Sequence, residues 1–233
     1  GVIYVDRGWQ SIVDQLVAIA VAAGVEVVDH EPVVAIDVSG PERVVTMPSS
    51  SVAASTVVIA AGGPRAATGL LGEDPAGWVE RAGPAQHAAV LDVGGPPVAD
   101  TFLLSADEPL YLSAHAPIAD LAPPGRHLVT VMRYLDDADA RDARTDRAAL
   151  ERHAAFAGVA PAPGRDVERF LAAPVVAWGS SVPGIQRPTG LELAARGVLV
   201  AGDWVGDLLL ADAAVASGVA AGTAAARTVV TCR

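Results

Sequence analysis

The first apolar pattern along the chain has the period of an α-helix. Between residues 9 and 23, apolar side chains recur at the spacing of one helix face, at Ile12, Leu16 and Ile19. Gly24 follows, and glycine readily adopts the left-handed conformation that ends a helix. The pattern therefore predicts a helix over residues 9–23. The same kind of pattern predicts helices over residues 144–157 and 213–230, and a short helical segment over residues 167–170.

Short apolar runs bounded by Gly, Pro and Ser predict strands. Val33–Val38 and Arg43–Met47 flank a turn cluster, which predicts a hairpin, and Thr56–Ala60 is a continuous apolar run typical of a buried parallel strand. Residues 48–55 are interpreted as a small-residue linker. Further strands are predicted over residues 25–28, 87–93, 101–105, 110–114, 127–135, 171–178 and 197–201.

The order of these elements predicts an α/β (α+β) fold with two domains. No helical pattern separates the strands between residues 87 and 135, so that sheet is expected to be antiparallel. The helix, hairpin and buried strand near the start, with the strand and helix at the end, indicate a parallel sheet. We therefore predict a parallel-sheet domain from residues 1–82 and 181–233, and an antiparallel-sheet domain from residues 83–180.

Composition excludes several kinds of site. The net charge of −11 argues against nucleic acid as a partner, and all 16 basic residues are Arg, so no P-loop or Schiff-base lysine exists. Cys232 is the lone cysteine, which excludes an intrachain disulfide and fits a reducing, cytoplasmic location. No apolar run is long enough for a transmembrane segment. The five His residues are dispersed, so no metal site is predicted.

One strand-to-helix junction has the residues of a ligand site. Gly202 and Asp203 follow the predicted strand 197–201, and a small-residue helix follows them. Glycine lets a ligand approach the backbone, a carboxylate accepts hydrogen bonds from sugar hydroxyls, and a helix N-terminus attracts negative charge. From the residues alone, a plain turn with a capping aspartate is an equally good interpretation.

Four segments of the chain carry a family resemblance: Gly8–Leu16, Val33–Ile36, Thr56–Pro64 and Gly197–Ala226. Together they resemble the C-terminal portion of the FAD-dependent phytoene dehydrogenase-like and flavin-containing amine oxidase superfamily. The resemblance implies an FAD-binding domain of Rossmann-like type, an antiparallel substrate domain and hydride transfer to flavin. The resemblance implies cofactor contacts at Val33 or Val34, Ala61, Gly62, Gly202, Asp203, Ala214 and Val215.

The sequence departs from that family at one motif. The family opens with G-x-G-x-x-G, which this sequence lacks, and the chain starts at Gly1 without Met. We therefore expect a C-terminal fragment that binds FAD weakly when isolated and associates with the missing N-terminal segment or forms a homodimer. The alternative is a non-catalytic binding module that kept the fold and lost FAD.

The substrate is expected to be a small, apolar molecule bound at the antiparallel sheet. No general base is identified from the sequence, so the catalytic residues are unknown. The lack of Lys favours a desaturase-like branch over an amine-oxidase branch that uses a lysine. Candidate pocket residues, chosen because they lie on or beside predicted strands of that sheet, are Tyr111, His115, Arg133 and Trp178.

Overall fold

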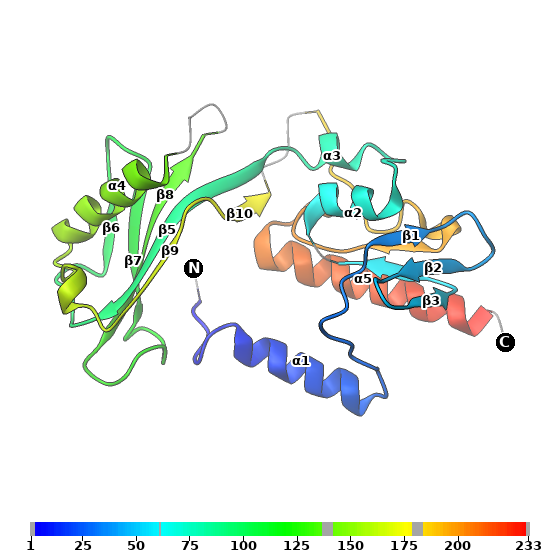
Figure 1. Cartoon of the computed structure of the whole chain (residues 1–233), viewed down its shortest axis with the longest axis horizontal. Coiled ribbons are helices and arrows are strands. Elements are labelled where there is room, and N and C mark those ends of the chain that lie inside the picture. Colours follow the sequence, from blue (N-terminus) through cyan, green and yellow to red (C-terminus); the bar gives the residue numbers. More distant parts are fainter. Residues whose placement is uncertain (1–2, 61, 137–141, 179–183, 232–233) are drawn as a thin grey trace. The chain divides into compact units, whose positions relative to one another are not determined.

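A computed structural model describes residues 3–60, 62–136, 142–178 and 184–231 (Figure 1). The chain forms two compact units. Unit 1 comprises Gly1–Val27 and Gln86–Val176, and unit 2 comprises Val28–Ala85 and Ala177–Arg233. The breaks near residues 86 and 176 lie close to the predicted domain limits at 83 and 180. The first 27 residues differ from the prediction, because they group with the antiparallel unit.

Unit 1 is built on an antiparallel sheet, as the sequence predicted. The strand order is β10-β5-β8-β7-β6, and β9 also pairs with β5. The strands are β5 (Ala85–Gly95), β6 (Phe102–Leu104), β7 (Leu110–Ala116), β8 (His127–Leu135), β9 (Val167–Leu171) and β10 (Val175–Trp178). A short 3-10 helix, η1 (Ala162–Gly164), precedes β9.

Helix α4 (Ala143–Phe156) covers one face of this sheet (Figure 1). Its first turn is capped by Asp142, whose carboxylate accepts a hydrogen bond from the backbone N–H of Arg144 at 3.1 Å. Leu150 of the helix packs with Leu91, Val131 and Leu112, which lie opposite one another on three adjacent strands. Since strand side chains alternate between faces, the residues before and after each of these core positions lie on the opposite face of the sheet. We call it the open face because α4 does not cover it.

The N-terminal segment belongs to unit 1 because it is hydrogen bonded to the loop after β7. The backbone N–H of Arg7 donates to the carbonyl of Asp120, and the N–H of Asp120 donates to the carboxylate of Asp6, both at 2.9 Å. Helix α1 (Gln10–Ala22) follows, as predicted, but it has no buried residue. Its predicted apolar face is therefore exposed, with Ile19 at 67%.

Unit 2 contains a two-stranded parallel sheet between helices. Strands β4 (Val57–Ile59) and β11 (Val198–Val200) pair in parallel. Helix α5 (Leu210–Thr231) packs on one face through Leu199, Ala201 and Ala221. On the other face, Ile59 and Val200 pack with Ala67 of α2 (Gly63–Leu71) and with Trp78 of α3 (Trp78–Arg81).

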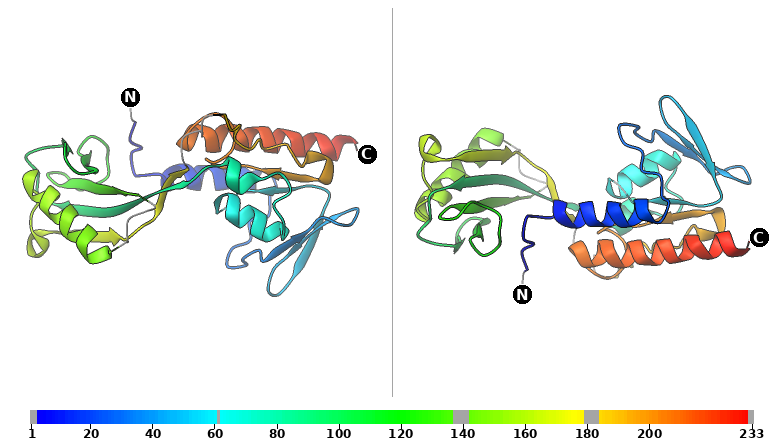
Figure 2. Two further views of the ribbon diagram at one scale, coloured as in Figure 1. Left: turned by 90° about the horizontal axis from the view of Figure 1, so that it is seen from above. Right: turned by 90° about the horizontal axis from the view of Figure 1, so that it is seen from below.

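A small antiparallel sheet completes unit 2. Its strands β1 (Ala35–Asp37), β2 (Arg43–Thr46) and β3 (Ser51–Ala54) are connected in sequence order. Figure 2 shows this sheet on the side of unit 2 away from α5. The 3-10 helix η2 (Ala194–Arg196) leads into β11, and the buried Arg43 donates to the carbonyl of Arg196 at 2.8 Å. The predicted combination of a partial parallel sheet and an antiparallel sheet is confirmed.

Several local predictions were wrong, and tertiary pairing explains most of them. Residues 25–28 form no strand, and residues 51–54 form β3 rather than a linker because they pair with β2. Residues 167–170 are strand rather than helix because β9 makes five register pairs with β5. The predicted strand 171–178 is divided, since Leu171 ends β9 and residues 175–178 form β10. Helices α2 and α3 had no clear periodic signal. No helix in the described part of the chain is long and apolar enough to cross a membrane.

Candidate functional site

The two parallel strands of unit 2 end side by side. Ile59 is in register with Val200, and the N–H of Ala201 donates to the carbonyl of Ile59 at 3.0 Å. The turns that follow, at Gly62 and Gly202, therefore lie at the same edge of the sheet. Crevices at the carboxyl ends of parallel strands are the usual ligand sites of open α/β sheets. This edge is the candidate site.

Gly202 is held between Trp204 and helix α5. A Cβ atom at this position would lie 2.8 Å from the indole Nε1 of Trp204, so no side chain fits without displacement. The backbone N–H of Gly202 donates to Ser217 Oγ at 3.0 Å, and that hydroxyl lies 2.7 Å from the carbonyl of Ala213. Ser217, which belongs to the segment that resembles the flavin motif but was not among the predicted cofactor contacts, therefore fixes α5 to the turn after β11.

A buried arginine holds the loop between β11 and α5. The side chain of Arg187 donates to the carbonyls of Asp203 at 2.6 Å and Leu208 at 2.8 Å, and the residue is only 2% exposed. Two loop carbonyls therefore share one guanidinium, and this satisfies acceptors that the turn leaves free. One weak signal for this role is visible in the sequence, because Arg187 is a charged residue inside an otherwise Pro- and Gly-rich stretch.

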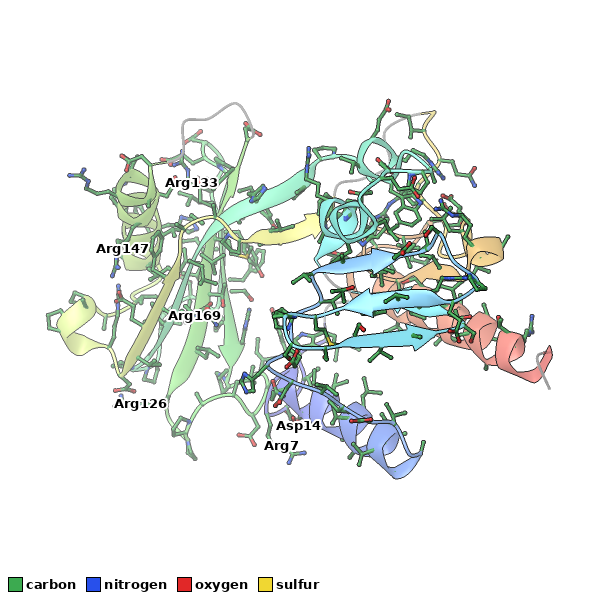
Figure 3. All side chains as sticks on the ribbon, turned by 45° about the vertical axis from the view of Figure 1, so that its right-hand side comes forward. Arg7, Asp14, Arg126, Arg133, Arg147 and Arg169 are labelled. Atoms are coloured by element: carbon green, nitrogen blue, oxygen red, sulfur yellow. The ribbon has the colours of Figure 1, made fainter. Side chains whose placement is uncertain are left out.

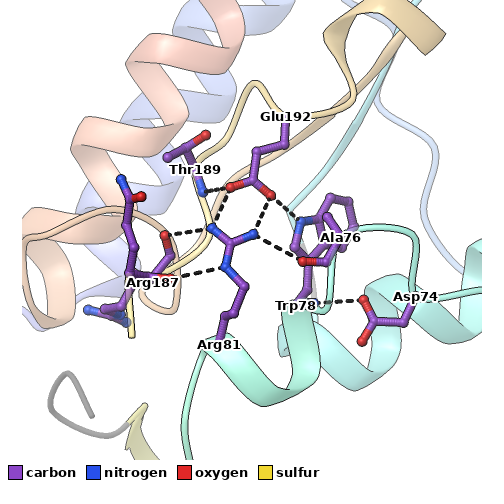
Figure 4. Close-up of polar contacts among 8 residues, drawn as sticks. Asp74, Ala76, Trp78, Arg81, Arg187, Thr189 and Glu192 are labelled. Atoms are coloured by element: carbon purple, nitrogen blue, oxygen red, sulfur yellow. Dashed lines mark hydrogen bonds and ion pairs between the residues drawn. The ribbon is translucent and has the colours of Figure 1, made fainter. Parts of the chain in front are cut away.

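The segment that carries Arg187 is fixed in turn by an ion pair (Figure 4). Arg81 of α3 donates to both carboxylate oxygens of Glu192, at 2.7 and 2.9 Å, and to the carbonyl of Arg187 at 3.1 Å. Glu192 also accepts from the Trp78 indole and the Thr189 backbone N–H, both at 2.9 Å. Burial works to raise the pKa of Glu192, but these donors outweigh it and hold the pKa below its ordinary value.

An apolar cavity of about 620 Å³ lies beside β4. It is lined by four consecutive positions of that strand and its end, Val57–Ala60, together with Val33, Gly62 and the small side chain of Ala66. Among the described residues, no charged side chain lines it. These residues fit a flat apolar ring such as part of FAD, but they offer no cation or side-chain donor for its diphosphate.

The predicted cofactor residues are only partly brought together. Val33 and Gly62 line the cavity, whereas the N–H of Val34 donates to the carbonyl of Thr46 at 2.8 Å. Gly202 and Asp203 lie at the shared sheet edge. Three further residues complete the predicted set: Ala214 and Val215 are exposed on α5, and Ala61 lies outside the described residues.

The four predicted pocket residues lie in three different places. Tyr111 alternates with core residues of β7 and lies on the open face of the unit 1 sheet. His115 lies at the irregular register near the end of β7, and its ring contacts Tyr4, which also contacts Ser113 on that face. Arg133 lies on the opposite face, where it pairs with Asp146 of α4 (Figure 3). Trp178 belongs to unit 2, where its indole packs against Gly63. The structure therefore brings together only the first two.

Tyr111 and His115 have partly buried surroundings with neighbouring hydroxyl groups. The hydroxyls of Tyr4 and Ser113 lie 2.8 Å apart, and the Tyr4 ring lies 4.5 Å from the His115 ring. Burial lowers the pKa of His115, although the Asp92 carboxylate opposes this shift. Burial also raises the pKa of Tyr111, with the Ser113 hydroxyl opposing it. Both groups are therefore held in their neutral forms near neutral pH.

Comparison with known proteins identifies the fold. No protein-family model and no curated protein matches the sequence. A proposed protoporphyrinogen oxidase from Exiguobacterium sp. 255-15 matches with a TM-score of 0.70 at 14% identity, covering 94% of this chain and 51% of that chain. An oxidoreductase from Methanosarcina mazei matches with a TM-score of 0.63 at 17% identity, covering 92% and 54%.

A cyclohexylamine oxidase from Brevibacterium oxydans IH-35A matches with a TM-score of 0.54 at 16% identity, covering 84% of this chain and 48% of that chain. The chain spans about half the length of the structures that it matches. At these identities the likeness concerns the fold. The chain has the fold of these oxidases and of this oxidoreductase, which is the fold that the sequence resemblance implied.

Proposed function

We propose that the chain is part of an FAD-dependent oxidoreductase of the phytoene dehydrogenase-like type, which transfers a hydride from an organic substrate to flavin. The observation that carries the proposal is the shared edge of β4 and β11, where Gly62 and Gly202 lie together. The fold comparisons support it. When bound, FAD would supply the redox chemistry.

The chain's own residues would position the cofactor and the substrate. Val33 and Gly62 would contact an apolar ring of FAD in the cavity beside β4. Arg187 and Ser217 would keep the turn at Gly202 and Asp203 in place. The open face of the unit 1 sheet, with Tyr111 and His115, would bind the substrate. We assign no general base.

The test is the flavin content of the natural polypeptide that includes these residues. We expect visible flavin absorbance after purification, and bleaching of that absorbance by substrate under anaerobic conditions. A natural polypeptide that takes up no FAD on reconstitution would contradict the proposal. The 233-residue chain alone is expected to bind FAD weakly, since the cavity offers no charged partner for the diphosphate; tight stoichiometric binding would show that expectation to be wrong.

The lack of charged side chains among the described residues that line the cavity favours a second candidate function. An apolar cavity without charged lining residues also suits a non-catalytic binding module that has lost FAD. The reconstitution experiment separates the two candidates, because the module requires that the natural polypeptide remain colourless. We also retain the cytoplasm as the proposed location, on the basis of the lone cysteine.

We further propose that the edge of β4 away from β11, which pairs with no described strand, accepts a strand from a segment outside these 233 residues. Two parallel strands rarely form a sheet alone, and parallel sheets are normally buried. Val58, at the centre of β4, is 40% exposed, and the apolar cavity runs along this strand. Mixing the chain with the rest of its natural polypeptide should give a 1:1 complex by light scattering. A homodimer formed through β4, or a gene that encodes no further segment, would contradict this.

A further inference from the structure

The open face of the unit 1 sheet carries one row of polar residues. The strand registers place Ser113 opposite Thr130, Thr130 opposite Asp92, and Asp92 opposite Arg169. These four residues, from β7, β8, β5 and β9, alternate along their strands with core residues that pack against α4. They therefore form a continuous line across the face that α4 leaves uncovered. We call this line the polar row.

The neighbouring rows on the same face are mostly apolar, and the exceptions are the Tyr111 hydroxyl and His115. On one side, the registers align Tyr111, Met132, Val90 and Leu171. On the other side, they align Leu128, Gly94 and Val167. A solvated sheet face would carry polar residues at most positions. A single polar row between mostly apolar rows instead has the composition of a ligand site, with a few polar groups in apolar surroundings.

Most groups of the polar row already have partners. Ser113 is 4% exposed and lies 2.8 Å from the Tyr4 hydroxyl. The Thr130 hydroxyl donates to Asp92 Oδ1 at 2.6 Å. This fixes the Asp92 carboxylate in position, and its second oxygen has no hydrogen bond to another described residue. The neutral His115 lies two residues beyond Ser113 on β7, next to the Tyr4 ring.

Arg169, like Arg7 and Arg144, differs from the arginines of this unit that form ion pairs, and of these three only Arg169 lies in the polar row. Its guanidinium makes no hydrogen bond or ion pair with any described residue, although Asp92 is its register neighbour. Other unit 1 arginines are paired with carboxylates: Arg126 with Asp166, Arg133 with Asp146, Arg147 with Glu168, Arg152 with Glu108, and Arg165 with Glu151. Figure 3 labels Arg169 and three of the paired arginines, Arg126, Arg133 and Arg147. An exposed guanidinium beside a fixed carboxylate offers five N–H donors and one acceptor site to a ligand.

We propose that the polar row binds a small carboxylic acid that has a hydroxyl or ammonium group next to its carboxylate and an apolar body. Arg169 binds the ligand carboxylate, and the free oxygen of Asp92 accepts a hydrogen bond from the adjacent hydroxyl or ammonium. The apolar body lies on Tyr111 and Met132. As a description of the substrate, this inference rests on the proposed function. It modifies the expectation of a small, apolar substrate by adding a polar end.

Three probes with the same phenyl ring test this assignment. The probes are 3-phenyllactate, which has both groups, 3-phenylpropionate, which lacks the hydroxyl, and 3-phenyl-1-propanol, which lacks the carboxylate. Their dissociation constants are measured by NMR titration of the FAD-free chain. We expect phenyllactate to bind most tightly and the alcohol to bind about tenfold or more weakly than phenylpropionate, because a charge-assisted hydrogen bond is lost.

Two substitutions separate the two contacts. Arg169→Gln should remove the preference for phenylpropionate over the alcohol, and Asp92→Asn should remove the preference for phenyllactate over phenylpropionate. Arg126→Gln and Asp166→Asn, which break an ion pair elsewhere on unit 1, should leave both preferences unchanged. Thermal unfolding of each variant shows whether it is folded, and exposed Arg169 should tolerate the change.

The dissociation constants of the three probes test the inference directly, and their measurement does not depend on FAD binding. Equal binding of acid and alcohol, an unchanged preference in Arg169→Gln, or no binding of any probe to the folded chain would overturn it. The titrations contain no FAD. Failure of the natural polypeptide to bind FAD would therefore contradict the proposed function without affecting the measured preferences among the three probes. Conversely, a flavoprotein whose polar row binds none of the probes would retain the proposed function and lose this substrate class.

Discussion

Arg81 donates to both carboxylate oxygens of Glu192, and this ion pair joins α3 to the segment that carries Arg187 (Figure 4). Both side chains are partly buried, at 26% and 20% exposure. Since the carbonyl of Arg187 also accepts from Arg81, the ion pair fixes the base of the loop that ends at α5. The geometry of the sheet edge therefore depends on residues that do not line it.

We expect Arg81→Gln to lower the free energy of unfolding by about 2 kcal/mol, because Glu192 loses its bidentate partner and stays half-buried. Urea denaturation measures the change. Arg196→Gln is the matched control, because its ion pair with Glu73 is more exposed and should contribute less than about 1 kcal/mol. Equal effects of the two substitutions would show that the Arg81 pair has no special structural role.

Arg187→Met should release the loop between β11 and α5. The substitution keeps an apolar stem in the buried site but leaves the carbonyls of Asp203 and Leu208 without their donor. We expect about 2–3 kcal/mol of destabilisation and faster amide hydrogen exchange at residues 203–210. Exchange rates that rise uniformly over unit 2 would indicate general loosening instead of local release.

Gly202→Ala and Gly218→Ala should have opposite effects. A Cβ atom at Gly202 would lie 2.8 Å from the Trp204 indole, so we expect about 2 kcal/mol of destabilisation. Gly218 lies inside α5 with no atom within 4 Å of an added Cβ, so alanine should stabilise the helix by about 0.5–1 kcal/mol. Thermal unfolding midpoints test both signs, and a stabilised Gly202→Ala would show that the turn can relax.

His115 should make stability depend on pH. Burial lowers the pKa of His115 from its ordinary value of 6.5, with Asp92 opposing the shift. Below that ordinary value the unfolded chain binds more protons than the folded chain, so stability falls as pH drops from 6.5 to the folded pKa. We expect His115→Gln to lose less stability than the natural protein between about pH 7.5 and pH 5.5.

His30→Asn provides the control for this experiment. The His30 side chain is 93% exposed. The backbone φ of His30 is +58°, a value that asparagine tolerates. The control should keep the pH dependence of the natural protein. A His115→Gln variant that loses the same amount of stability as the control would show that His115 does not contribute to the pH dependence.

The sequence by itself determined most of the elements and the overall class. Strong periodicity was sufficient for α1, α4 and α5, and apolar runs bounded by Gly and Pro were sufficient for β4, β5, β7, β8 and β11. These patterns are local, since each reflects the burial of one face or of a whole short strand. The resemblance in four segments was then enough to predict the fold that the comparisons found.

Tertiary structure decided which residues act together. β9 is a strand because it pairs with β5, although its own residues favoured a helix. Tyr111, Arg133 and Trp178 were equally plausible partners in sequence, but strand alternation and the division into units separate them. The roles of Arg81, Arg187 and Arg169 depend on carbonyls and carboxylates far away in sequence. No local pattern encodes those distances, because register and packing set them when the chain folds.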